Sequence, residues 1–168
     1  MRLTLALLLT GLLLCCYGSR ALADSTTELA LRRMCGPSAI RLAPLVRAEA
    51  RRNLLSPVSL VAVMSVESRC RSSAVNPVSG AIGLMQILPH GSADGGYPPD
   101  ELRADDLNVK LGAAHLGRLL VFCGAWSGAL SVFSGFRYCR STRYSRRVQA
   151  AERSFWRWLS PLPGSRMS

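Results

Sequence analysis

The chain has 168 residues, which is enough for one compact domain but excludes two of ordinary size. Its 21 basic residues outnumber its 10 acidic ones, so the formal net charge is +11 at pH 7. This balance favours polyanionic partners, namely nucleic acid, anionic lipid or a bacterial envelope, and charge alone does not choose among them.

Residues 1–23 are predicted to be a cleavable signal peptide. A basic residue follows the first Met, residues 3–14 are predominantly apolar, and Ala21-Leu22-Ala23 has the small-x-small pattern of a cleavage site. Because the apolar run is too short for a comfortable membrane span, we expect no stable membrane insertion. A retained signal anchor, or a lipoprotein attached through Cys15 or Cys16, are the alternatives. Export predicts a location in the periplasm or cell envelope of a bacterium.

The remaining chain is predicted to have a flexible leader (residues 24–36), one domain (residues 37–160) and a disordered tail (residues 161–168). Apolar residues at helical spacing predict helices over residues 37–55, 57–68, 105–124, 126–135 and 141–159. Pro44 either kinks the first helix or marks its start, whereas Ser56 and Pro57 form a start signal for the second. Residues 71–80 and 90–104 are rich in turn-forming residues and predict loops. No convincing strand appears, so the fold class is all-α.

Without the first 23 residues, four cysteines remain, at positions 35, 70, 123 and 139. An even number in an exported chain suggests two disulfides. If the first two helices form an antiparallel hairpin, Cys35 and Cys70 meet, which leaves the other two cysteines to pair by elimination. The chain has no Cys-x-x-Cys pair, and its two histidines are His90 and His115, so we expect no metal site.

Glu67 is unusual because it ends an apolar helical run. Leu60, Val63 and Met64 share its helix face, and it lies in the last turn, where the helix dipole disfavours a negative charge. Burial and the dipole would both raise its pKa, and a carboxyl that is protonated near neutral pH can act as a general acid. The alternative is an ordinary surface ion pair with Arg71, one helical turn further on.

The residues after Glu67 resemble a known family. Glu67-Ser68 is followed by Ala74, Pro77 and Gly80-Ala81, and then by Gly83-Leu84-Met85-Gln86 and Pro89. This order and spacing resemble the lytic transglycosylase domain of the soluble lytic transglycosylase and goose-type-lysozyme-like superfamily. The resemblance extends over about residues 39–151 and implies a single compact, lysozyme-like helical domain.

Two later motifs of the family are similar but altered. Residues 107–116 resemble its third motif, in which Asn108 is expected to brace a loop or a helix start, and His115 replaces a tyrosine. Residues 129–135 fall where the family has a Tyr-Asn pair, and here the pair is Phe133-Ser134. The family's tyrosine hydroxyl lies near the catalytic carboxyl, so we expect either that Tyr138 substitutes for it or that activity is low.

The resemblance implies a peptidoglycan lytic transglycosylase that cleaves the MurNAc–GlcNAc β-1,4 bond and forms 1,6-anhydromuramoyl ends, without metal or cofactor. Glu67 would be the catalytic acid–base. Substrate would be bound by Ser68, by the backbone of Gly83, Leu84 and Met85, and by Gln86, with His115 and Phe133 lining the cleft. The expected partners are peptidoglycan glycan strands and a secretion-system or pilus assembly that needs the wall opened. We expect a monomer that does not bind nucleic acid.

Three alternatives stay open at this point. A hydrolase would use one of the loop acids between Asp94 and Asp106 to hold water. A protein that binds peptidoglycan but has weak or no turnover would keep the groove, as Phe133-Ser134 hints. The arginine-rich residues 137–158 are either a nucleic-acid-binding or membrane-disrupting element, or a solvated basic face suited to anionic wall polymers.

Overall fold

Helices dominate the computed structural model, which describes residues 25–89 and 96–160. Residues 25–35 are helical, and the elements that follow are η1 (Pro37–Leu42), α2 (Ala43–Arg52), α3 (Pro57–Ser68), η2 (Glu101–Arg103), α4 (Asp105–Cys123), α5 (Trp126–Phe133) and α6 (Arg143–Leu159). Within these residues the extended pairing is limited to isolated bridges at Val75–Ile82 and Ile82–Ile87. The all-α prediction is confirmed.

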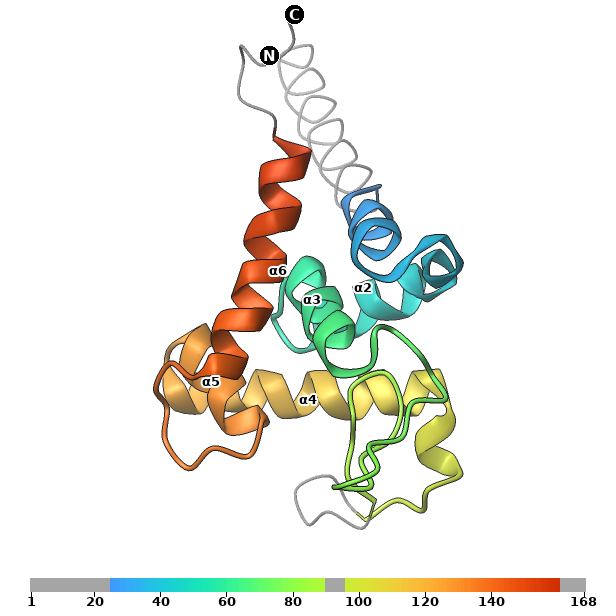
Figure 1. Cartoon of the computed structure of the whole chain (residues 1–168), viewed down its shortest axis with the longest axis vertical. Coiled ribbons are helices and arrows are strands. Elements are labelled where there is room, and N and C mark those ends of the chain that lie inside the picture. The colour runs from blue at the N-terminus through green and yellow to red at the C-terminus, as the bar shows by residue number, and fades with distance from the viewer. Residues whose placement is uncertain (1–24, 90–95, 161–168) are drawn as a thin grey trace, which may run out of the picture.

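The helix α3 forms the centre of the core. Its residues Leu60 to Met64 are fully buried, and it packs against α2 and α6. Figure 1 shows α3 in the middle of the molecule, with α6 to one side, α2 to the other and α4 crossing below. A helix that is apolar on every face requires cover all round, which these neighbours supply. Glu67 lies in the last turn of α3, where the core meets the surface.

The predicted helix boundaries largely hold. The helix α2 begins at Ala43 with Pro44 in its first turn, so this proline marks the start of an α-helix and follows a short 3-10 segment. The helix α3 begins at Pro57 as expected, and α4 ends at Gly124, whose φ of 66° is in the left-handed region. Among the described residues, no helix is long and apolar enough to cross a bilayer.

The prediction of a flexible leader over residues 24–36 is wrong for residues 25–35. Thr27, Ala30, Leu31 and Met34 recur at the spacing of a helix face, and the first three are buried while Met34 packs on the core. Burial of this apolar stripe stabilises a helix that the polar composition had obscured. The signal peptide and the tail from residue 161 onward lie outside the described residues, as do His90 and Asp94.

Both disulfide pairings are confirmed. Cys35–Cys70 joins the end of the helical residues 25–35 to the residues just after α3, with a Cα–Cα distance of 5.5 Å. Cys123–Cys139 joins the end of α4 to the loop before α6, with a Cα–Cα distance of 5.4 Å. The first bridge holds the chain three residues beyond Glu67, so it restrains the part of the fold that presents this carboxyl.

Candidate active site

A tight turn at residues 82–87 forms one side of the site. The backbones of Ile82 and Ile87 exchange two hydrogen bonds, of 2.9 and 3.0 Å. Gly83 has a φ of 80°, and a Cβ placed there would lie 2.4 Å from Asn108 Nδ2 and 2.9 Å from the Leu102 carbonyl oxygen. Both the backbone conformation and the space therefore require glycine at this position.

Asn108, in the first turn of α4, holds this turn in place. Its Oδ1 accepts from the backbone N–H of Met85 at 2.7 Å, and its Nδ2 donates to the carbonyls of Ile82 at 2.9 Å and Leu102 at 2.8 Å. The Asn108 side chain is buried, so these three bonds satisfy groups that have no access to water. The expected loop-bracing role of Asn108 is confirmed.

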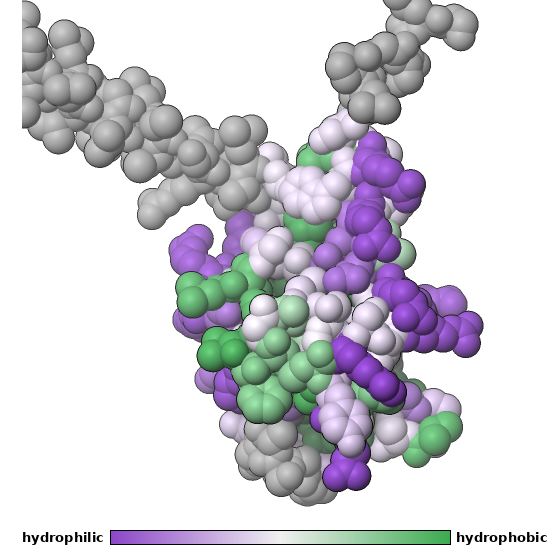
Figure 2. All heavy atoms as spheres, turned by 90° about the vertical axis from the view of Figure 1, so that its left-hand side faces the viewer, coloured by the Kyte–Doolittle hydropathy of each residue, from purple (hydrophilic) through white to green (hydrophobic). Residues whose placement is uncertain are grey.

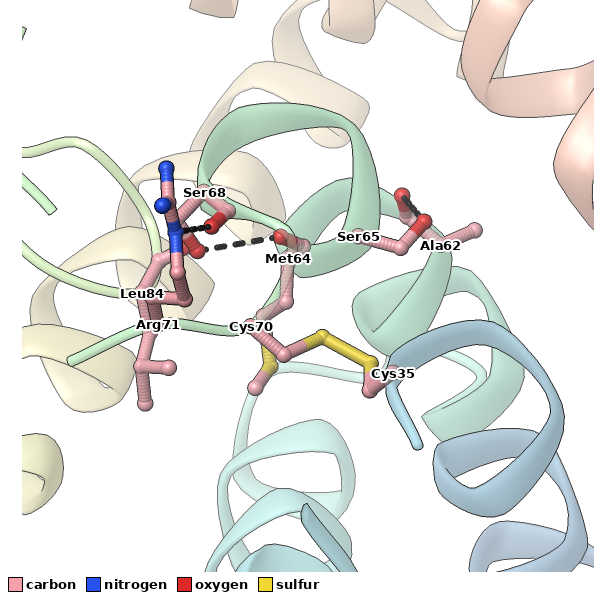
Figure 3. Close-up of a disulfide and its surroundings, with 8 residues drawn as sticks. All are labelled: Cys35, Ala62, Met64, Ser65, Ser68, Cys70, Arg71 and Leu84. Carbon is pink, nitrogen blue, oxygen red and sulfur yellow. Dashed lines mark hydrogen bonds between the residues drawn. A yellow bond between two sulfur atoms is a disulfide. The ribbon is translucent and has the colours of Figure 1, made fainter. Parts of the chain in front are cut away.

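Ser68 ties the end of α3 to the same turn. Its hydroxyl lies 2.9 Å from the Leu84 carbonyl oxygen and 3.1 Å from the Met64 carbonyl oxygen, both of which accept hydrogen bonds (Figure 3). Figure 3 also shows the Cys35–Cys70 bridge beside this contact. The end of α3 is thus fixed from two sides, by a covalent bond and by a buried hydrogen bond.

The side chains of three residues expected at the substrate are part of this brace. Ser68, Leu84 and Met85 are buried, and Met85 packs so closely on Gly112 of α4 that a Cβ there would lie 2.6 Å from the Met85 Cβ. The N–H of Gly83 is also occupied, since it donates to the Ala74 carbonyl at 2.8 Å. Their side chains pack inward because the turn must fill the space between α3 and α4.

An open cavity of about 420 Å³ lies where α3, the turn, the end of α5 and the start of α6 meet. Of the residues predicted for the site, Glu67, Gln86 and Phe133 line it. The other lining residues are Asn76, Ser79, Ala81, Leu88, Ser134, Gly135 and Tyr144. His115 stands behind this wall, with its ring edge-on to Phe133 at a centroid distance of 5.6 Å.

Glu67 has the surroundings of a proton donor. It is half-buried, and burial is the largest influence on its pKa, which is raised above the ordinary value. The hydroxyl of Tyr144 donates a hydrogen bond to Oε1. This bond and the positive charge of Arg147 lower the pKa of Glu67, but burial outweighs them and the pKa stays above its ordinary value. Burial also raises the pKa of Tyr144, and the nearby Glu67 raises it further, so the phenol keeps its proton.

The alternative ion pair between Glu67 and Arg71 does not form. Arg71 donates its Nε to the Ser68 carbonyl oxygen at 3.2 Å, which directs its guanidinium to the backbone at the helix end. The carboxyl of Glu67 is therefore turned toward the cavity and Tyr144. Within the described residues, it is the one carboxyl that lines this cavity.

Tyr144 is a candidate site residue that sequence reasoning missed. Tyr138, expected to supply the hydroxyl, is 65% exposed and contacts Phe136 edge-on, so that expectation is wrong. Tyr144 belongs to the apolar stripe of α6 that includes the buried Val148 and Phe155. A tyrosine within such a stripe needs a hydrogen-bond partner for its hydroxyl, and this signal could have identified it.

The arrangement can deliver and recover one proton within a polar cleft. In the described part of the chain, no group of three or more possible metal-binding side chains gathers. The cavity's polar lining of Asn76, Ser79 and Gln86 suits a hydroxyl-rich ligand, while Leu88 and Phe133 add apolar surface for a sugar ring.

Comparison with known families and proteins gives one match. Residues 44–136, more than half of the chain, match the family model of the transglycosylase SLT domain. The matched stretch includes Glu67 and the turn, and it ends before Tyr144. No curated protein matches the chain.

Proposed function

Since the chain belongs to the transglycosylase SLT domain family, whose domains have a lysozyme-like all-α fold and act on peptidoglycan, we propose that it is a lytic transglycosylase with Glu67 as its single acid–base catalyst. It cleaves the β-1,4 bond between N-acetylmuramic acid and N-acetylglucosamine. The observation that carries the proposal is the half-buried Glu67, with a raised pKa, at the wall of the cavity.

In the first step, protonated Glu67 gives its proton to the glycosidic oxygen as the bond to C1 of the muramoyl residue breaks. The hydroxyl of Tyr144 is bonded to Oε1, so Oε2 is the oxygen that carries the proton toward substrate. The acetamido group of the substrate stabilises the positive centre that develops at C1. A second protein carboxylate is not needed at this point, which agrees with a cavity lined by one carboxyl in the described chain.

In the second step, the muramoyl 6-hydroxyl attacks C1 and closes the 1,6-anhydro ring. The Glu67 carboxylate takes the proton of that hydroxyl, so the enzyme returns to its starting state and no water is consumed. Tyr144 stabilises the carboxylate between the two steps, because its hydroxyl donates to the ionised form. The same contact keeps the carboxyl oriented in the absence of a hydroxyl at Phe133.

Gln86 is proposed to bind sugar through its amide oxygen. Its Nε2 donates to the Gly83 carbonyl at 3.0 Å and to the Ala74 carbonyl at 3.3 Å, which fixes the amide plane. The amide oxygen is then the part available to accept from a sugar hydroxyl. Asn76 and Ser79 extend this polar side of the cavity.

Export to the periplasm or cell envelope is part of the proposal. Disulfides persist in oxidising compartments, so the two bridges support an exported protein. A wider role, in which the enzyme opens the wall for a secretion or pilus assembly, is a proposal that rests on the resemblance to the family.

The test is digestion of isolated peptidoglycan by the parent protein, by Glu67→Gln and by Glu28→Gln, with the soluble products weighed by mass spectrometry. Glu28 is exposed in the helical residues 25–35, outside the loop acids, and serves as the matched control. We expect 1,6-anhydro products from the parent and the control and none from Glu67→Gln. Products with reducing ends would identify a hydrolase that uses a loop acid. Glycan binding without products from any of the three would identify a binding protein.

A further inference from the structure

Exposed apolar side chains gather at the end of the molecule formed by the close of α4 and the loop before α6. Val121 and Phe122, in the last turn of α4, are 84% and 77% exposed. Phe136 and Tyr138 are also exposed, and their rings contact edge-on. The Cys123–Cys139 bridge holds these two stretches together, and the four exposed side chains are here called the α4–loop patch.

The α4–loop patch lies in a long stretch of the chain that carries positive charges and no negative ones. Between residues 117 and 151 the sequence has no Asp or Glu and six arginines, at positions 118, 137, 140, 143, 146 and 147. The Arg140 guanidinium stands over the Phe136 ring, 4.8 Å from its centroid, so charge and apolar surface are interleaved. Figure 2, which faces this end of the molecule, shows hydrophobic side chains gathered low on the face with strongly hydrophilic ones along both sides.

The shape of the α4–loop patch narrows the choice of partner. Val121, Phe122 and Tyr138 are each more than 60% exposed, so these side chains protrude from the surface. A hydrated anionic wall polymer would match the charge of the arginines but would offer no apolar surface to the exposed Val121 and Phe122. Protruding apolar side chains surrounded by arginine instead match the surface of a lipid bilayer, in which anionic headgroups lie above apolar acyl chains.

We propose that the α4–loop patch docks the protein on the surface of an anionic lipid bilayer. Val121 and Phe122 enter the boundary between headgroups and acyl chains, while Arg137 and Arg140 contact the lipid phosphates. The loop that carries these arginines also supplies Ser134 and Gly135 to the cavity. Docking therefore places the cleft beside the membrane, where glycan close to the bilayer can enter it. This surface attachment differs from insertion of a spanning helix.

The test is sedimentation of the protein, purified from cells that express the full chain, with vesicles of phosphatidylglycerol or of phosphatidylcholine. Three variants are compared with the parent: Val121→Ser with Phe122→Ser, Arg137→Gln with Arg140→Gln, and the control Leu54→Ser. Leu54 is 87% exposed and lies just after Arg51 and Arg52 at the end of α2. It is therefore an exposed apolar side chain near arginines, as in the patch, but it belongs to another part of the chain. Residues 1–24 are the same in every variant, so any contribution from them cancels.

We expect the parent and Leu54→Ser to bind phosphatidylglycerol vesicles at least tenfold more tightly than phosphatidylcholine vesicles. Loss of the two apolar side chains should weaken binding by about tenfold or more, and loss of each arginine by about fivefold, because both apolar burial and charge contribute. Thermal unfolding checks that each variant is folded. If Val121→Ser with Phe122→Ser binds as the parent does, the patch is a purely electrostatic surface and the proposal is overturned. Equal binding to both lipids, or binding to neither, overturns it as well.

Discussion

Replacement of Asn108 by Ala should destabilise the protein more than any other loss of a single neutral polar side chain around the site. The variant leaves one backbone N–H, that of Met85, and two carbonyls, those of Ile82 and Leu102, without their partner. Because Asn108 is buried, water does not readily replace the amide. Each of the three groups costs about 1–3 kcal/mol when left unsatisfied, and partial relaxation of the turn brings the expected loss to about 3–5 kcal/mol.

The measurement is urea unfolding at neutral pH, with Asn53→Ala as the matched control. Asn53 is half-buried at the end of α2 and makes one side-chain hydrogen bond, to the Glu49 carbonyl at 2.8 Å, so its loss should cost about 1 kcal/mol. Asn108→Ala should also lower turnover of peptidoglycan, since the turn that carries Gln86 is no longer fixed. If the two variants lose the same free energy of unfolding, the brace described here does not hold the turn.

Three further changes test the site and its supports. Tyr144→Phe removes the hydrogen bond that favours ionised Glu67, so the pKa of Glu67 should rise further; the alkaline limb of the kcat/KM profile should move to higher pH while kcat falls, and an unmoved limb would contradict this role. Because burial raises the pKa of Glu67 above 4.5 in the folded state, the protein loses stability as pH rises through the folded pKa. Glu67→Gln should therefore gain Tm relative to the parent as the pH rises above 4.5, and parallel Tm curves would count against a buried, proton-holding carboxyl. Cys35→Ser with Cys70→Ser opens a bridge with a sequence separation of 35, and loop entropy gives an expected loss of about 4 kcal/mol in the free energy of unfolding; a denaturation midpoint equal to that of the oxidised parent would refute it.

The helices around Glu67 could be predicted because local signals agree with tertiary burial. Pro57 fixes the start of α3, the run from Leu60 to Met64 is apolar on every face, and Gly124 ends α4. The turn after Glu67 was identified from its Gly-Leu-Met-Gln residues through family resemblance. The reason for that pattern, a glycine pressed against Asn108 and a Met pressed against Gly112, required the structure.

Two features escaped prediction because they depend on contacts between distant segments. The helix at residues 25–35 has a weak local signal, and its stability comes from burial of Ala30 and Leu31 and from the bridge at Cys35. The expectation for Leu84 and Met85 concerned their backbone, and the burial of their side chains and of Ser68 required the structure. In a tight turn packed between two helices, most side chains must point inward. The few that do not, such as Gln86, line the cavity.

The position of Tyr144 shows why a substitution within a motif need not remove a hydroxyl from the site. The end of α5 and the start of α6 both border the cavity, so a hydroxyl can reach Glu67 from either wall. Reasoning along the sequence offered Tyr138, close to Phe133, or low activity as the alternatives, but the loop after α5 carries the Tyr138 side chain out to solvent. Packing of α6 against α3 instead brings the first turn of α6 to the last turn of α3. Phe133 then contributes apolar surface to the cavity wall, while Tyr144 supplies the hydrogen bond to Glu67, so separate residues provide these two features.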